Sequence, residues 1–297
     1  MSAMVDAAGA DDATARSKVV GRSKPVGYLA AAVCIAVITV MLMPLLLSFL
    51  ASIKPSAEAR MSPPSYLPSA LSIENYLKVF NYQAGMWTYV TNSLMVACLT
   101  IFICLALAVP AGYGLARFKM WGKEIWFIIL LAPLMIPYQA LLTPLYLSFS
   151  KMGLANSHFG LALVHAILQL PFSIYLMRNS FEAIPRELEE AAKVDGAISF
   201  QILVRIFLPL VIPGIVTVAL FAFIASWNEF LSALIFMNNE QSFTVPIMLV
   251  SVRAGRQGAV DWGALQAGVV ISILPCILIY LLLQKYYVSG FLNGAVK

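Results

Sequence analysis

Residues 190–210 read EAAKVDGAISFQILVRIFLPL, a stretch that begins charged and alanine-rich and ends apolar. Gly196 predicts the end of a first helix, because glycine readily adopts the left-handed conformation that terminates helices. A second helix is predicted to begin near Ser199 and to run through Leu208 and Pro209. A charged helix that returns to apolar sequence marks a point where the chain leaves an apolar solvent and re-enters it.

The residues before this stretch favour a helix that starts at Pro185, since proline suits a first helical turn. Glu189 and Lys193 are spaced as an i, i+4 ion pair, and acidic residues near the start complement the helix dipole. Four residues share roughly one face of this helix: Leu188, Ala191, Ala192 and Asp195. The two adjacent alanines predict a shallow strip that another surface can approach closely, although an amphipathic interfacial helix has the same pattern.

The rest of the chain is apolar enough to require a membrane. Of its 297 residues, 61% are hydrophobic and 11% are charged, whereas a soluble domain has about 25% charged residues. About 20 consecutive apolar residues cross a bilayer as a helix, and six stretches satisfy this length: 26–50, 89–115, 125–147, 159–177, 206–227 and 264–283. Runs this long exclude the alternating strands of an outer-membrane barrel, so we predict an all-α protein with six transmembrane helices.

The predicted span at 26–50 also has features of a cleavable signal peptide, because basic residues precede it and residues 57–59 read AEA. Its apolar core exceeds the roughly 7 to 15 residues of a signal sequence. We therefore predict a retained helix.

The basic residues are distributed unequally between the two sides of the predicted membrane. With the N-terminus inside, 13 of the 19 Lys and Arg residues fall on the cytoplasmic side and six on the other. The positive-inside rule then places both termini in the cytoplasm. The predicted organisation is a flexible cytoplasmic tail at 1–25 and a six-helix transmembrane domain at 26–297, with an external loop at 51–88 and a cytoplasmic loop at 178–205.

Several kinds of chemistry are missing from the sequence. No G-x-x-x-x-G-K-[ST] motif is present, and Gly112-Tyr113-Gly114 is better explained as a helix-packing feature than as a phosphate loop. The two histidines, His158 and His165, have no metal-ligand spacing, and no acidic residue lies at a span centre, where ion coupling would need one. We predict no catalytic residues, no metal site and no cofactor held by this chain.

Polar residues in or near the spans are candidates to line a pathway for a neutral polyol, which needs hydrogen-bonding and aromatic groups. For His165, which lies near Gln169, hydrogen bonding between helices is the favoured interpretation and lining of a pathway is the alternative. Glu229, just beyond the fifth span, suits an outer gate, a helix-end hydrogen bond or a contact with a partner. The candidate lining residues are Asn92, Tyr138, Gln139, His165, Gln169 and Asn228.

The opening stretch also resembles a known family. The spacing E-A-A-x3-G-x9-I-x-L-P is met by Glu190, Ala191, Ala192, Gly196, Ile206, Leu208 and Pro209, and it resembles the EAA loop of bacterial ABC importer permeases. The segments IPRELEEAAKVDGA, NSLMVA, SWNEFLSAL and QKYYVSGFLNGAVK are similar to the carbohydrate-uptake, binding-protein-dependent branch with MalG-like permeases.

The resemblance implies a type I importer fold in the bacterial inner membrane, with a coupling helix between the fourth and fifth spans. It assigns ATPase coupling to Glu190, Ala191, Ala192, Asp195 and Gly196. It further implies a MalF-like second permease, two ATP-binding subunits that hold ATP and Mg, an extracytoplasmic solute-binding protein and a sugar or oligosaccharide substrate. The chain itself is then a pore subunit and not an enzyme.

Two other functions rank below this one. An ion-coupled secondary transporter of a small polar solute is the alternative, and a membrane-embedded enzyme ranks below both.

Overall fold

The computed structural model describes residues 24–61, 63, 65–254 and 260–295. The chain divides into a first unit up to Leu50 and a second unit from Ala51 onward. The described part of the first unit is the apolar helix α2 (Lys24–Ser52), which continues two residues into the second unit. The predicted tail at 1–25 lies outside the described residues except for its last two, and these already begin α2.

The described helices agree with the six predicted spans. Four of them are long and apolar enough to cross a membrane alone: 27–52, 86–117, 158–182 and 262–284. Two further pairs pass the same test together, and each is bent at a short break. Counting each bent pair as one span gives six spans, at positions close to those predicted from hydropathy.

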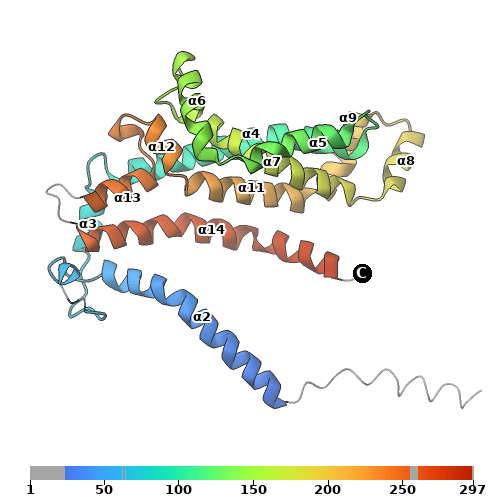
Figure 1. Ribbon diagram of the computed structural model, residues 1–297. Coiled ribbons are helices and arrows are strands. Elements are labelled where there is room, and N and C mark those ends of the chain that lie inside the picture. The colour runs from blue at the N-terminus through green and yellow to red at the C-terminus, as the bar shows by residue number, and fades with distance from the viewer. Residues whose placement is uncertain (1–23, 62, 64, 255–259, 296–297) are drawn as a thin grey trace, which may run out of the picture. The chain divides into compact units, whose positions relative to one another are not determined.

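The centre of the second unit is the pairing of α4 (Met86–Arg117) with α7 (His158–Glu182), and α11 (Ile212–Trp227) packs against both (Figure 1). Gly112 permits the close approach of α4 to α7. A Cβ atom there would lie 2.6 Å from the Met177 Cβ atom and 2.8 Å from the Arg178 backbone nitrogen. The packing interpretation of Gly112 is therefore confirmed.

Two other groups of helices surround this centre. The long helix α14 (Trp262–Ala295) packs on α11, on α3 (Glu74–Phe80) and on α13 (Val245–Ala254). The short helix α12 (Leu231–Phe236) packs on α7 and on α6 (Tyr138–Lys151). The short 3-10 helix η4 (Glu240–Ser242) lies against α4.

The third span is not straight. It consists of α5 (Lys123–Leu131), the 3-10 turn η2 (Ala132–Met135) and α6, and the two halves meet at 97°. Ile136 adopts an extended backbone directly before Pro137, because a proline ring clashes with a helical conformation of the preceding residue. Figure 1 shows α6 turning away from the direction of α5. The third span is therefore sharply broken at its prolines.

The fifth span is bent as well, by 75°. Its first half comprises α9 (Ser199–Ile202), the π-helical turn η3 (Leu203–Phe207) and α10 (Leu208–Leu210), and its second half is α11. The break lies at Val211, between Pro209 and Pro213. The Val211 amide still donates to the Phe207 carbonyl at 2.9 Å, so the bend keeps a hydrogen bond across it.

The predicted external loop at 51–88 is ordered by its own polar groups. This loop contains the helix α3, which is preceded by the 3-10 turn η1 (Glu58–Arg60). Asn75 is fully buried, donates to two backbone carbonyls and accepts from Ser56 at 2.9 Å. Hydrogen bonds from Ser65 and Ser69 lower the pKa of Glu58 to about 2.

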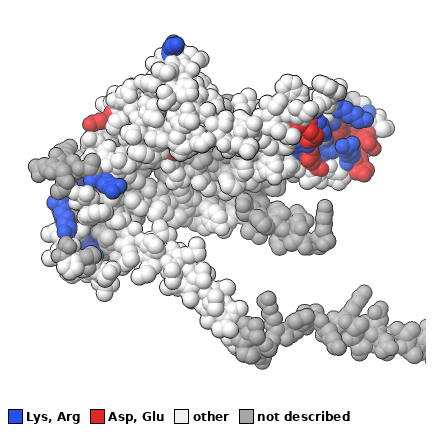
Figure 2. Space-filling view, in the orientation of Figure 1, with Lys and Arg blue, Asp and Glu red and all other residues white. Residues whose placement is uncertain are grey.

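On the face shown in Figure 2, most charged side chains of the second unit gather at its two ends, and the surface between them is largely uncharged apart from the tip of α6. One end carries α3 and η1, and the other carries the helix α8 (Arg186–Val194). An uncharged band between charged ends is the surface that a bilayer requires. The second unit is therefore a multi-pass membrane bundle.

Candidate functional site

The EAA stretch forms α8, as predicted. Pro185 precedes the first helical residue, and Gly196, with a φ of +80°, directly follows the C-cap residue Asp195. The amide of Ala197 donates to the Ala192 carbonyl and that of Gly196 to the Lys193 carbonyl, each at 3.0 Å. This pair of bonds is the Schellman arrangement, which satisfies the last carbonyls of a helix. The helix therefore has a defined end rather than a frayed one.

α8 has an inner and an outer face. Glu189 and Ala192 point inward and are each 8% exposed. Leu188, Ala191 and Val194 lie on exposed positions, and Val194 is 88% exposed. The predicted strip of two alanines is thus corrected: Ala192 seats α8 on this chain's own core, and only Ala191 remains on the outer surface.

An arginine that the sequence analysis did not single out holds α8 in place. Arg117, at the C-terminus of α4, is buried, and its Nη2 atom donates to the Phe181 and Ile184 carbonyls. Its Nη1 atom lies 3.9 Å from Glu189 Oε2, while Glu189 Oε1 accepts from Lys193 Nζ at 2.6 Å. The hydrogen bond to Glu189 raises the pKa of Lys193. Arg117 therefore connects α4, the end of α7 and α8.

An aromatic cluster continues this connection toward the bent fifth span. Phe207 of η3 is fully buried, and the Arg117 guanidinium lies 4.8 Å from its ring centroid. Tyr113 and Phe181 pack edge-on to one another at 5.6 Å, and Tyr113 packs in the same way on Phe207 at 5.7 Å. Movement of α8 is thereby linked to α4, to α7 and to the start of the fifth span by direct packing.

Nothing in the local sequence marked Arg117 as different from the other basic residues at span ends. Its partners come from α7, from the turn after it and from α8, all distant in the chain. The one available signal was the position of Arg117 two residues beyond the predicted span at 89–115, on the same predicted side as the EAA stretch.

Two of the six predicted lining residues are buried and bonded within the chain. The Asn92 amide donates to the Gln241 and Phe243 carbonyls at 2.7 and 3.0 Å and so fixes the segment around η4 to α4. His165 lies between Ser226 and Ser232, with its ring nitrogens 2.8 and 3.0 Å from their hydroxyl oxygens. Both arrangements match the interpretation in which these groups join helices.

The other four lining candidates are at least partly accessible. Gln139 and Asn228 are exposed, and Tyr138 and Gln169 are half-buried. The Asn228 side chain donates to the Ile224 carbonyl at 2.9 Å and borders a cavity of about 290 Å³ between α11 and α13. The structure does not gather all six candidates around one space.

Glu229 uses both carboxylate oxygens inside the chain. They accept from the amides of Leu231, Ser232 and Ala233 at 3.0–3.1 Å and from the Ser232 hydroxyl. Glu229 Oε2 also lies 3.5 Å from His165 Nε2, and Tyr138 interacts electrostatically with the same carboxylate. Of the three roles considered for Glu229, the structure shows the helix-end hydrogen bonds, which hold the start of α12.

These features define a polytopic helical membrane protein in which a short, rigidly held helix links two spans. The chain belongs to the family of binding-protein-dependent transport system inner membrane components, whose pattern it matches over residues 108–291. It is 41% identical over 231 residues to the probable ABC transporter permease protein YurM of Bacillus subtilis, across 78% of this chain and 76% of that protein.

Two further comparisons agree with this membership. The trehalose/maltose transport system permease protein MalG of Thermococcus litoralis is 33% identical over 240 residues, across 79% of this chain and 86% of that protein. A chain from the crystal structure of a bacterial ABC transporter involved in the import of the acidic polysaccharide alginate has a TM-score of 0.78 and 25% identity. That match covers 91% of this chain and all of the other. The fold is therefore that of an ABC importer permease.

Proposed function

We propose that this chain forms half of the translocation pore of an ATP-driven sugar importer and that α8 receives the motion of an ATPase subunit. The supporting observation is the combination of a fixed inner face and an exposed outer face on one short helix. Arg117 and Ala192 hold α8 to the bundle, while Leu188, Ala191 and Val194 stay on the outside. A helix held this firmly transmits a push instead of absorbing it.

In this proposal Glu190 and Asp195 flank the exposed face and offer charges to a basic group on the ATPase. Both side chains are exposed, and neither forms an ion pair within the described part of the chain. ATP and Mg are held by two partner ATPase subunits. A second, similar permease completes the pore, and an extracytoplasmic binding protein delivers the substrate.

The orientation follows from the distribution of charge. Basic residues that were predicted to be cytoplasmic gather at the α8 end of the second unit (Figure 2). We therefore place this end, and both termini, in the cytoplasm of a bacterial cell. The α3 end, with its ordered loop, then faces the binding protein. The ion pair of Arg60 with Asp261, at 2.6 Å, connects this loop to the segment before α14.

The cargo is proposed to be a sugar or oligosaccharide. The relative named above for trehalose and maltose transport supports a neutral carbohydrate. The accessible polar groups of Tyr138, Gln139, Gln169 and Asn228 are suited to hydroxyl groups. No acidic side chain sits at a span centre to bind a coupling ion, which disfavours the secondary transporter.

The decisive experiment is reconstitution of the chain with its second permease, ATPase and binding protein in proteoliposomes. We expect sugar uptake that requires ATP, is unaffected by ionophores and is lost with Gly196→Pro, which would break the end of α8. The control variant is Gly153→Pro, which lies in the loop after α6. Gly114→Pro is not suitable as a control because it would break α4. Uptake driven by an ion gradient without ATP would overturn the proposal.

A further inference from the structure

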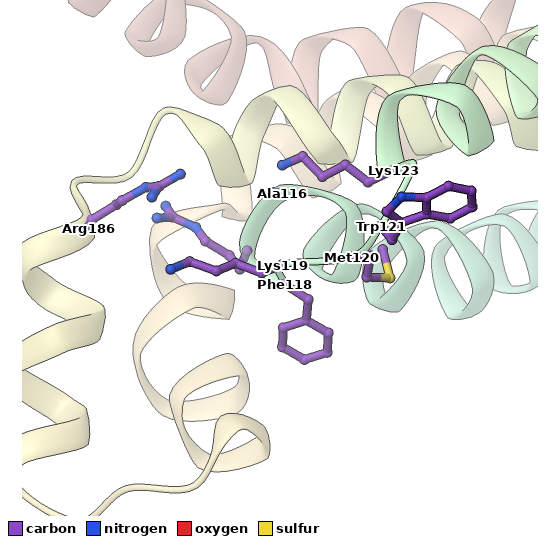
Figure 3. A pocket seen from close by; sticks show the side chains of 8 residues that line it. Ala116, Phe118, Lys119, Met120, Trp121, Lys123 and Arg186 are labelled. Atoms are coloured by element: carbon purple, nitrogen blue, oxygen red, sulfur yellow. The ribbon is translucent and has the colours of Figure 1, made fainter.

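A cavity of about 390 Å³ opens at the α8 end, beside the loop that joins α4 to α5 (Figure 3). Four basic residues line it: Arg117 at the end of α4, Lys119 in the loop, Lys123 at the start of α5 and Arg186 at the start of α8. Figure 3 shows that Lys119, Lys123 and Arg186 reach the cavity from three different elements.

Arg117 faces Glu189 at 3.9 Å, but the other three basic residues of the cavity have no such partner in the described part of the chain. Among the described residues, no carboxylate lies within ion-pair distance of Lys119, Lys123 or Arg186. Glu124, next to Lys123, is engaged with Arg178 at 2.8 Å. Like charges held together without a counter-ion repel one another, so an anion that entered the cavity would be bound favourably.

Arg117 provides an independent indication. Its side chain is only 3% exposed, and its Nε atom is buried with no hydrogen-bond partner in the described structure. A buried, unpaired guanidinium donor is costly. Because Arg117 lies in the cavity wall, an anion in the cavity would stabilise its guanidinium through charge, whereas the buried Nε atom itself is not accessible to a ligand.

The surroundings of the cavity indicate a ligand of the membrane surface. Trp121 in the same lining is 95% exposed, and α5 carries exposed Ile125 and Trp126 immediately after it. None of the described α5 side chains is buried. Tryptophan and lysine together at the start of an apolar span are typical of the zone where lipid headgroups lie.

We propose that this cavity binds the phosphate of an anionic phospholipid headgroup, with Lys119, Lys123 and Arg186 as its cationic partners and the acyl chains along α5. Arginine and lysine form charge-assisted hydrogen bonds with phosphate oxygens. Because Arg186 is the first residue of α8, the headgroup would join the start of α8 to the α4–α5 loop. This inference goes beyond the proposed transport function, which does not require it.

The test uses the assembled transporter in nanodiscs of phosphatidylcholine with or without phosphatidylglycerol, and native mass spectrometry counts the lipids retained after mild delipidation. The triple variant Lys119→Gln/Lys123→Gln/Arg186→Gln is compared with a matched variant, Lys151→Gln/Arg205→Gln/Arg253→Gln, whose residues are exposed and lie outside the cavity. We expect phosphatidylglycerol affinity to fall on the order of 100-fold in the first variant, at about fivefold for each basic residue removed. The matched variant should retain the lipid.

Three outcomes would overturn the proposal. Equal retention by both variants would show that the cavity does not hold the lipid. A free anion would be identified as the ligand if inorganic phosphate bound to the transporter in lipid-free micelles and also displaced phosphatidylglycerol from the transporter in nanodiscs. Retention only when the ATPase subunits are absent would identify acidic groups of the ATPase as the normal occupant. Thermal unfolding in phosphatidylcholine alone verifies that the triple variant is folded, and ATP-driven uptake there tests the transport function separately.

Discussion

α8 and α12 are both short helices that a largely buried charged side chain fixes to the bundle, and they differ in what they expose. Arg117 holds α8 through Glu189 and the carbonyls before it, whereas Glu229 holds α12 by accepting from its first amides. Ser232, Ala233 and Phe236 of α12 are fully buried. Val194 of α8 is almost fully exposed.

The two helices therefore use the same kind of charged anchor for different purposes. A helix anchored by a charge and covered by its own chain adds to the stability of the bundle. A helix anchored equally well but left uncovered has a surface available to another protein. Variants that release one anchor at a time distinguish the two uses.

The largest effect is expected from Arg117→Met, which removes the donors and keeps much of the volume. The Phe181 and Ile184 carbonyls and the Glu189 carboxylate would lose their partner, at a cost of about 3 kcal/mol. Hydrogen exchange should show faster exchange throughout α8. Arg205→Met, at an exposed arginine, serves as the control, and unchanged exchange of α8 in Arg117→Met would contradict its role.

A smaller effect is expected from Glu229→Gln. The amide keeps one acceptor for the start of α12 but loses the charge that faces His165, so the unfolding free energy should fall by about 1–2 kcal/mol. Exchange should increase in α12 and remain unchanged in α8. Glu240→Gln, on the outer surface, is the control, and equal effects of the two variants would argue against an anchor at Glu229.

Gly196→Ala tests the end of α8 alone. A Cβ atom added at Gly196 or at Gly114 would meet no neighbouring atom within 4 Å, but only Gly196 has a positive φ. Alanine should therefore cost about 1 kcal/mol at position 196 and none at the helical position 114. Thermal unfolding of the two variants measures the difference, and an equal response would show that the left-handed turn is not needed.

The smallest effect on stability is expected from Val194→Ser, because this side chain has almost no contacts to lose. The unfolding free energy should change by less than about 0.5 kcal/mol, while affinity for the ATPase subunit should fall. Leu71→Ser, an equally exposed change at the α3 end, should leave that affinity unchanged. Loss of affinity in both variants would remove the distinction between the two ends.

The spans and α8 could be predicted because their signals are local. Apolar runs of sufficient length specify membrane helices, and Pro185 and Gly196 mark the ends of α8 through their own backbone preferences. Prolines flank the breaks of the third and fifth spans. The 97° and 75° angles depend on how the flanking segments pack, which a local signal does not contain.

The anchors could not be predicted because they join residues far apart in the chain. Ala191 and Ala192 are equivalent in sequence, and only the packing of α8 shows that Ala192 faces inward. Asn92 and His165 had the composition of lining residues, and their partners around η4 and α12 show that they hold helices together. The sequence can therefore single out a polar residue in an apolar span, but its role depends on which residues lie next to it in the fold.

The most direct test of the account is the number of sugar molecules imported per ATP hydrolysed by reconstituted transporters that carry Arg117→Met or Glu229→Gln. Both variants are assayed well below their unfolding temperatures beside the unmodified protein. This ratio should fall with Arg117→Met, because α8 no longer moves with α4 and α7, and should stay unchanged with Glu229→Gln. An unchanged ratio with Arg117→Met, or an equal fall in both variants, would contradict it.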